Sequence, residues 1–500
     1  MLPSPRPLFS TRMFNSENED MDEIFDVVVV GCGVAGLSAA VSAAQRGLNV
    51  CVLERATRDE RGGQSRYTEA YLRMKSLDEV ADDFEEHLAE NTGRYMDPDL
   101  MAEMALDRAS WSQITRSLAV ADADVLSTFA TQVPEAVQWL RGMGVRFDFL
   151  PTQFLTSSQP RLLPVGGGEA MVETLATQAE ALGVTFHYEC TARDLVFDTH
   201  GAVAGVWAWK RNAGRRRYAG TVVLASGGFE GNPEMLAHYL GPRSVYLRPV
   251  CKGGYYNKGE GIAMALRAGA APCGDFGSYH AEPVDPRSGV SEPSVFVFPY
   301  GILINKQGRR FTDEAPGTVD AWYERVTRRI YEQDEGIAYV VLDQRVKDIP
   351  NYRLAIRTDQ PAIEASSLEA LAGHLGIPAD ALATTVAAYN AGCHGGHYDP
   401  LVADGLATEG VEPRKSNWAL PLDRAPYFAY PIISANVFTF GGLKVDAAAR
   451  VLNSDGAPIP GLYAAGETVG MYYGNYTGAT SVLKGLVFGK LAGETIGNQY

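Results

Sequence analysis

Three glycines and one glutamate have the residue types and the spacing of a nucleotide-binding site. Gly31, Gly33 and Gly36 form a Gly-x-Gly-x-x-Gly pattern, and Glu54 follows 23 residues after the first glycine. The first glycine permits a tight turn, the second lets a pyrophosphate approach the backbone, and the third lets a helix pack closely on a strand. A carboxylate at the position of Glu54 can bind ribose hydroxyls. The spacing therefore predicts a dinucleotide site.

The segments around this pattern predict the elements that must position it. Residues 26–31 are a β-branched run, which is typical of a strand buried on both faces of a parallel sheet. Residues 37–46 are rich in alanine and predict a helix, which Gly47 ends, and residues 49–54 predict a second strand. The helix N-terminus would direct N–H groups and the positive end of its dipole at the phosphates.

A second loop favours FAD over a nicotinamide cofactor. Arg61-Gly-Gly-Gln-Ser65 follows Glu54 closely. A flavin extends across the fold and needs a Gly/Ser loop beside its pyrophosphate and ribityl chain, whereas a nicotinamide enzyme more often continues with βαβ repeats.

Later segments complete the predicted cofactor site. Residues 221–229 predict a buried strand that runs into a turn at Ser226, Gly227 and Gly228, and residues 461–467 repeat this plan up to Gly466 and Glu467. Residues 480–489 predict a helix whose first N–H groups can face the flavin pyrimidine and stabilise negative charge there. Because these segments lie at both ends of the chain, we expect a discontinuous FAD domain with an insertion.

Length, charge and cysteine content limit the remaining possibilities. The chain has 500 residues, enough for two to four domains, and a net charge of −16, which argues against nucleic acid as a partner. Six scattered cysteines without a Cys-x-x-Cys motif predict a reducing, cytoplasmic location, and no apolar run is long enough to form a transmembrane segment. Residues 1–22 are expected to form a disordered tail. Cys393, His394 and His397 lack a conventional fourth ligand, so no metal site is predicted.

Taken together, these segments resemble the fumarate reductase/succinate dehydrogenase flavoprotein superfamily over about residues 24–495. The chain looks closest to tricarballylate dehydrogenase-like proteins and shares features with 3-ketosteroid dehydrogenases. The matching segments are Val30–Gly36, Arg61–Thr68, Ala225–Glu234, Asn257–Gly261, Asn305–Phe311 with Glu314, Lys415–Ala419, Gly461–Glu467 and Tyr472–Tyr476.

The resemblance implies an α/β fold in which a Rossmann-like FAD-binding domain of the GR2 type is interrupted by an α+β capping domain. By this comparison the FAD-binding domain comprises residues 23–277 and 437–500, and the cap comprises residues 278–436. No histidine lies between Glu54 and Gly62, where related proteins attach the flavin covalently, so noncovalent FAD is expected. The residues predicted to bind the cofactor are Gly31, Gly33, Val34, Ala35, Gly36, Glu54, Arg55, Gly62, Gly63, Gln64, Ser65, Ala192, Ser226, Gly227, Gly228, Asn257, Glu260, Gly466, Glu467, Ser481 and Val482.

Departures from the family pattern argue against fumarate as the substrate. Soluble fumarate reductases hold a dicarboxylate with two histidines and two arginines, one of which donates the proton. Here His280 matches the first histidine, whereas Phe438, Tyr476 and Thr318 stand at the other three positions.

The same comparison suggests catalytic roles. Tyr476 matches the tyrosine with which ketosteroid dehydrogenases bind the substrate carbonyl, so it is the candidate electrophilic donor. Tyr323 is the candidate base, with Arg325 as a competitor and a surface position as the alternative, and His280 is expected to contact a substrate oxygen.

Further residues complete the predicted substrate site. Arg66, Thr439 and Phe438 are predicted to bind substrate. Arg161 can also bind a carboxylate, but a solvated loop position is the favoured interpretation.

Three functions remain open from the sequence. The first is an FAD-dependent dehydrogenase that desaturates a C–C bond next to a carbonyl or carboxylate of a small organic substrate, with hydride going to flavin N5. The second is an enoate reductase that runs the reverse reaction, and the third is a non-catalytic FAD-binding protein. The electron acceptor is expected to be a quinone, oxygen or an electron-transfer protein, since no separate NAD(P) motif is present. Phe438 and Tyr476 favour a less anionic substrate, whereas the likeness to tricarballylate dehydrogenase favours a carboxylate.

Overall fold

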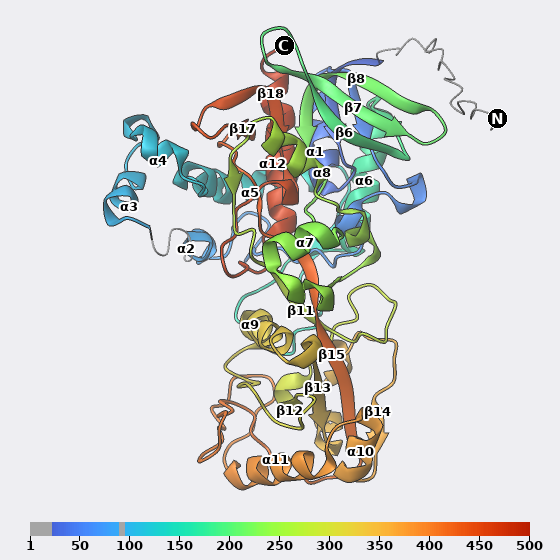
Figure 1. The fold of residues 1–500 in the computed structure, drawn as a ribbon, viewed down its shortest axis with the longest axis vertical. Helices are drawn as coiled ribbons and strands as arrows, with labels where there is room; N and C mark the ends of the chain where they lie inside the picture. Colours follow the sequence, from blue (N-terminus) through green and yellow to red (C-terminus); the bar gives the residue numbers. More distant parts are fainter. Residues whose placement is uncertain (1–22, 90–95) are drawn as a thin grey trace, which may run out of the picture.

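The computed structural model describes residues 23–89 and 96–500, which form two bodies along the long axis of the molecule. The upper body in Figure 1 contains a large sheet, in which the described chain begins with β1, and also the C-terminus, while the lower body contains a second sheet. Strand β15 (Tyr427–Thr439) runs along the lower body towards the upper one. The predicted disordered tail, residues 1–22, lies outside the described residues.

The first sheet has the parallel centre that the sequence predicts. Its order is β17-β18-β8-β1-β2-β5, and the strands from β18 to β5 are parallel. Their bounds are β1 Glu23–Val30, β2 Val50–Leu53, β5 Thr185–His187, β8 Gly214–Leu224, β17 Arg450–Leu452 and β18 Pro458–Ala464. Val27–Val30 are buried, because helices cover one face of β1 and an antiparallel layer covers the other.

Alternate residues of β1 separate two cores. Val27 and Val29 pack with the helices α1 (Val34–Ala44), α5 (Ala123–Gly142), α6 (Gly167–Ala181) and α12 (Ser481–Gly497). Val28 and Val30 pack with α8 (Glu260–Arg267) and with β6 (Cys190–Phe197) and β7 (Val203–Lys210), which continue from β8 as an antiparallel layer.

Helices α1 and α12 bring the two ends of the chain together, side by side in Figure 1. A Cβ added to Gly489 would lie 2.2 Å from Ala35 O, and one added to Gly493 would lie 2.6 Å from Ala39 O. Glycine at these positions therefore permits close backbone contact, which places the C-terminal segment beside the turn at residues 31–36. Segments predicted to bind the cofactor therefore meet here although they are distant in sequence.

The second sheet has the order β11-β15-β13-β12, with β14 and β9 also paired to β15. Its strands are β9 Arg248–Pro249, β11 Tyr279–Val284, β12 Ile302–Ile304, β13 Ile337–Leu342 and β14 Ile363–Ala365. Helix α9 (Val319–Tyr331) packs on β11 and β15, while α10 (Leu368–Leu375) and α11 (Ala379–Gly392) pack at the far end. The predicted fold class is confirmed. The predicted domain bounds stay a prediction. The second sheet does not follow them closely, because β15 continues past the predicted end of the cap at residue 436, and β9, which pairs with β15, precedes its predicted start at residue 278.

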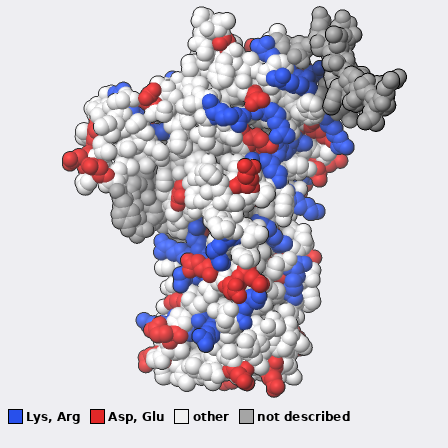
Figure 2. All heavy atoms as spheres, in the orientation of Figure 1, with Lys and Arg blue, Asp and Glu red and all other residues white. Residues whose placement is uncertain are grey.

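The surface carries both signs of charge. On the face drawn in Figure 2, Lys and Arg side chains gather in a band across the upper body with acidic side chains among them. The net charge of −16 therefore does not make this face uniformly acidic. Within residues 23–89 and 96–500, no helix has the length and apolar character needed to cross a bilayer.

Candidate active site

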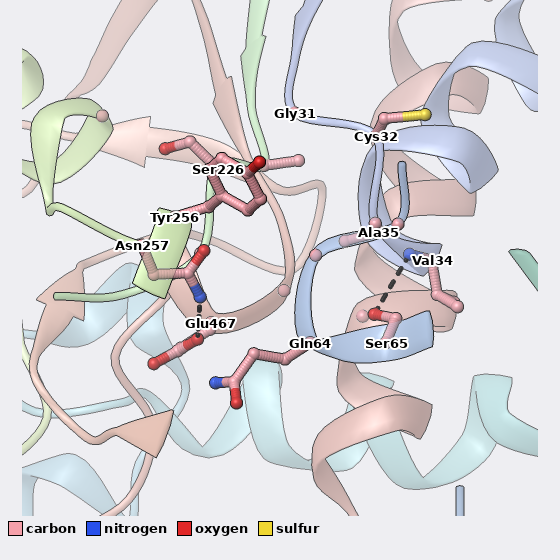
Figure 3. A pocket seen from close by; sticks show the side chains of 18 of the residues that line it. Gly31, Cys32, Val34, Ala35, Gln64, Ser65, Ser226, Tyr256, Asn257 and Glu467 are labelled. Atoms are coloured by element: carbon pink, nitrogen blue, oxygen red, sulfur yellow. Dashed lines mark hydrogen bonds between the residues drawn. The ribbon is translucent and has the colours of Figure 1, made fainter. Parts of the chain in front are cut away.

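The larger of two neighbouring cavities is lined by segments from both ends of the chain. It encloses about 1340 Å³ of space, part of it open to solvent, which is ample for an extended dinucleotide. Figure 3 shows the turn at Gly31, the loop at Gln64 and Ser65, and the Asn257–Glu467 pair around it. The predicted cofactor residues that line this cavity are Gly31, Gly33, Val34, Ala35, Glu54, Arg55, Gly62, Gly63, Gln64, Ser65, Ala192, Ser226, Gly227, Asn257, Glu260, Gly466, Glu467, Ser481 and Val482.

Two predicted cofactor residues lie behind the wall of this cavity. A Cβ on Gly36 would lie 2.0 Å from Gly31 O, and one on Gly228 would lie 2.1 Å from Glu467 Oε1. Neither glycine lines the cavity, and both serve the packing of the elements that do.

The turn before α1 has the geometry of a phosphate cradle. Gly31 has φ +106°, and a Cβ there would lie 2.3 Å from Ala225 O. No side chain caps α1, so its N-terminus offers N–H groups to an anion, and the Ser65 hydroxyl accepts from Val34 N at 3.3 Å (Figure 3). This bond fixes the second loop beside the first.

Glu54 lies at the end of β2, where the sequence places a ribose ligand. Its Oε2 accepts from Cys32 N at 2.9 Å and its Oε1 accepts from Ala56 N at 2.7 Å. Burial raises the pKa of Glu54, which the two backbone N–H groups and Arg55 oppose. Each oxygen retains a lone pair for a hydroxyl.

A buried pair of carboxyl groups, the predicted Glu467 and Glu230, which the sequence did not single out, supports the other end of the cavity. Asn257 Nδ2 donates to Glu230 Oε1 at 2.5 Å and to Glu467 Oε2 at 3.3 Å (Figure 3 shows the second bond). Glu230 also accepts from Gln64. Burial and the neighbouring Glu467 carboxyl raise the pKa of Glu230 well above its usual range. The glycine cradle, the uncapped helix and these carboxyl groups fit FAD.

The second cavity adjoins the first and contains the predicted catalytic residues. Its walls include His280 on β11, Tyr323 on α9 and Tyr476 just before α12, which are far apart in the sequence. The two cavities share the lining residues Thr68, Glu292, Val437, Ser481 and Val482. A molecule in the second cavity would therefore lie next to a cofactor in the first.

His280 and Tyr323 form a hydrogen-bonded pair, with 2.6 Å between Nε2 and the phenol oxygen. Burial, together with the charge of Arg328, lowers the pKa of His280 to about 3. Burial and the nearby Glu282 raise the pKa of Tyr323 well above its usual range. At neutral pH the imidazole is uncharged and the phenol keeps its proton.

The buried imidazole makes stability depend on pH. In the unfolded chain His280 takes up a proton below about pH 6.5, whereas in the folded chain it does so only near pH 3. Between these pH values the proton therefore binds to the unfolded state, and the free energy of unfolding decreases as the pH falls below 6.5. Between pH 6 and pH 5, we expect wild type to lose about 1 kcal/mol more than His280→Asn. Urea denaturation at both pH values measures this difference, and parallel losses in the two proteins would show that the imidazole is not buried uncharged.

Tyr476 directs its hydroxyl at the start of α12. Its oxygen accepts from Thr480 N at 2.9 Å and from Ser481 N at 3.0 Å, and it donates to Ser481 Oγ at 3.1 Å. Two donors on one phenol oxygen polarise its O–H bond and make it a stronger hydrogen-bond donor. Its ring lies 4.4 Å from the ring of His280.

The structure corrects the prediction for two arginines. Arg66 forms ion pairs with Glu169 and Glu173, both at 2.6 Å, and lines neither cavity. Arg161, expected to be solvated, is buried in the wall of the second cavity and pairs with Asp320 at 2.9 Å. In both cases an ion pair with a carboxylate that is distant in sequence fixes the place of the arginine side chain. Nothing in the sequence near Arg161 indicates that Asp320 is its partner.

Two other predicted substrate residues do not line the second cavity. The Thr439 hydroxyl donates to Glu467 Oε1 at 3.1 Å and accepts from Phe229 N at 3.2 Å, so it supports the cofactor side. Phe438 lines the first cavity and contacts the rings of His280 and Tyr476, so it forms part of the wall between the cavities.

The structure separates Tyr323 from its competitor. Arg325 lines neither cavity, and its guanidinium lies over the ring of Trp322. Tyr323 is buried and faces the second cavity, which excludes the surface alternative.

Several lining residues were missed in the sequence: Tyr71, Gln153, Phe154, Glu282, Glu292, Phe296 and Asp320. None belongs to a motif with a recognisable spacing. In the part of the chain that the structure describes, no group of three or more His, Cys, Asp or Glu side chains is arranged to hold a metal. His394 instead lies 3.5 Å from Glu409 on the surface.

Comparisons with known proteins agree with this geometry. The chain is 27% identical to NADH:acrylate oxidoreductase of Vibrio harveyi, and the match covers 96% of this chain but only 51% of that protein. It is 29% identical to 4-oxocyclohexanecarboxylate 2-dehydrogenase of Sinomonas cyclohexanicum, covering 95% of this chain and 93% of that one.

Solved structures show the same fold. A flavocytochrome c3 fumarate reductase in its open conformation matches with TM-score 0.73 and 23% identity over 95% of this chain and 78% of the other. The 3-ketosteroid Δ1-dehydrogenase of Sterolibacterium denitrificans matches with TM-score 0.71 and 20% identity, covering 96% of this chain and 100% of the other. The predicted likeness to both groups is confirmed. The family model of the FAD binding domain matches residues 26–483, and the chain belongs to that FAD-binding family.

Proposed function

We propose that the protein is an FAD-dependent dehydrogenase that desaturates a C–C bond next to a carbonyl or carboxylate of a small organic molecule. The observation that carries this proposal is the second cavity, where the His280–Tyr323 pair and Tyr476 lie beside the cofactor cavity. The likeness to a dehydrogenase of an oxocyclohexane acid supports it. The cofactor is held noncovalently in this proposal, since no histidine among the described residues lines the first cavity.

Each residue of the second cavity has a part in this chemistry. Bound FAD supplies the hydride acceptor. Tyr323 Oη takes the proton from the substrate carbon while its own proton passes to His280 Nε2 along the 2.6 Å hydrogen bond. Tyr476 would turn its O–H from Ser481 Oγ to the substrate oxygen and stabilise the negative charge that develops there. The buried walls keep water away from the proton that moves.

Anaerobic mixing with candidate substrates tests the proposal. Saturated ring ketones and carboxylic acids are added to the FAD-loaded protein, and the visible flavin absorbance is followed. Bleaching by at least one such compound is the expected result. If dithionite bleaches the flavin but none of these compounds does, and unsaturated analogues do not reoxidise it, the proposed function is wrong.

Reduction of a conjugated double bond is the second candidate, and one observation favours it. The Tyr323 phenol holds its proton and the His280 imidazole is uncharged, so the resting pair already contains the proton that saturation of a double bond consumes. The likeness to an acrylate oxidoreductase agrees with this direction. Stopped-flow reoxidation of the reduced protein by unsaturated ketones or acids, compared with oxygen and quinone, separates the two directions.

The electron partner and the location are part of the same proposal. A quinone, oxygen or an electron-transfer protein would take the electrons, as the single dinucleotide motif of the sequence suggests. The six cysteines are free thiols, which supports a reducing, cytoplasmic location.

Tyr476→Phe tests the electrophilic role. We expect the rate of flavin reduction by substrate to fall about 100-fold, as for one lost oxyanion donor, with FAD still bound. Tyr472→Phe is the matched control, because that buried tyrosine donates to or accepts from Thr480 Oγ1 and lines neither cavity. Equal rates in the two variants would remove Tyr476 from the mechanism.

A further inference from the structure

The charges around the second cavity are unusual for a carboxylate site. Three carboxyl groups line it, those of Glu282, Glu292 and Asp320. Among the described residues, Arg161 is the one guanidinium in its wall, and it is already bound to Asp320 at 2.9 Å. A substrate carboxylate would have to displace Asp320 to gain a cationic partner.

A second guanidinium, behind the wall, is also occupied. Arg357 pairs with Glu69 and lies 3.8 Å from Glu292, and Glu69 accepts from the Tyr71 hydroxyl. His280 is uncharged, as its lowered pKa indicates. The carboxyl groups in and behind this wall therefore outnumber the guanidinium groups, and each guanidinium has a carboxylate partner.

Aromatic rings form the remaining wall. Phe154 stacks on Tyr323 with 5.5 Å between ring centroids, and Phe296 packs 5.1 Å from Phe154 and 5.2 Å from Tyr323. These flat apolar faces suit a ring-shaped molecule, and they also attract a cation when carboxylates are near.

We propose that the second cavity takes a ring-shaped ketone or enone whose far end is neutral or cationic, and that Glu282 makes it reject the same ring with a carboxylate. This inference rests on the proposed function for the reacting carbonyl. It narrows the substrate class, since the sequence left a carbonyl and a carboxylate equally open.

The surroundings of Glu282 support this role. It accepts from Ser294 Oγ, and the charged groups near it are Arg357 and Glu69. The Tyr323 phenol is also close, as is the carboxyl of Glu292, whose pKa burial and Glu282 raise well above its usual range. Burial raises the pKa of Glu282 to about 7, so it is ionised at pH 8 and repels an anion placed in the cavity.

Redox-inert ring compounds of equal size test the inference. 4-Hydroxybenzamide, 4-hydroxybenzylamine and 4-hydroxybenzoate are titrated into the FAD-loaded protein at pH 8, and dissociation constants are measured by calorimetry. We expect the amide and the amine to bind at least about tenfold more tightly than the carboxylate. Tighter or equal binding of the carboxylate overturns the proposal.

Glu282→Gln provides the matched variant. It should strengthen binding of 4-hydroxybenzoate about tenfold and leave 4-hydroxybenzamide within about twofold. Glu169→Gln is the control, since Glu169 pairs with Arg66 outside both cavities and should change neither value. If Glu282→Gln does not hold FAD, wild type is titrated at pH 6, below the pKa of Glu282 of about 7, where loss of the Glu282 charge should likewise strengthen binding of 4-hydroxybenzoate. An unchanged preference in the variant or at pH 6 refutes the role of Glu282.

The result is separable from the proposed function. Because the probes are not oxidised, selective binding of the amide can be observed even if no ketone bleaches the flavin. Conversely, bleaching of the flavin by a carboxylic acid, together with tight binding of 4-hydroxybenzoate, would support the proposed dehydrogenase function but refute the proposed substrate class.

Discussion

Tyr323→Phe is expected to reduce the rate of flavin reduction by substrate about 1000-fold while FAD stays bound, within the range for a lost proton-transfer group. The substitution removes the hydroxyl that lies 2.6 Å from His280 Nε2. The ring itself would remain packed between Phe154 and Phe296, so the wall of the cavity should keep its shape. The loss would therefore report proton transfer and not packing.

Stopped-flow absorbance under anaerobic conditions measures this rate. Tyr279→Phe is the control, because Tyr279 is also buried, its hydroxyl contacts Ser434 Oγ at 2.9 Å, and it lines neither cavity. That control should stay within about threefold of wild type in rate, since a hydrogen bond far from the reacting atoms contributes little to the barrier. A Tyr323→Phe rate close to wild type would mean that another group moves the proton.

The cofactor site could be predicted because its requirements are local. A positive φ at Gly31 and the close approach of Gly36 to Gly31 O are needed wherever a strand turns into a helix below a pyrophosphate. Only glycine meets these requirements, so the spacing of the glycines in the sequence indicates the turn directly. The meeting of α1 and α12 could be expected because predicted cofactor segments lie at both ends of the chain, but the close contacts at Gly489 and Gly493 that hold the two helices together became visible only in the structure.

The substrate side could be predicted only in part, because its charges depend on contacts distant in sequence. Arg161 and Arg66 both lie in surroundings other than those expected, because their partners are distant in sequence: Asp320 lies 159 residues from Arg161 and Glu169 lies 103 residues from Arg66. Glu282 was missed for another reason. All six residues of β11 are buried, so alternation along the strand does not indicate which side chains face a cavity.

Gly31→Ala should weaken FAD binding by more than about 100-fold, since a shifted cradle would lose several charge-assisted contacts to the phosphates, each contributing about 1.5–3 kcal/mol. The new methyl group would lie 2.3 Å from Ala225 O, at a φ of +106° that disfavours alanine. The turn must therefore move away from β8, and the N–H groups at the start of α1 move with it.

Gly47→Ala is the matched control for this cofactor prediction. Gly47 also has a positive φ, +84°, but a Cβ there meets no atom within 4 Å. It should cost about 1 kcal/mol of stability for the backbone conformation and leave FAD affinity unchanged. Fluorescence titration of the FAD-depleted proteins measures affinity, and circular dichroism shows that both variants are folded. Because the two glycines share a backbone conformation and differ in what lies next to them, equal affinities would show that the close contact with Ala225 O does not shape the cofactor cradle.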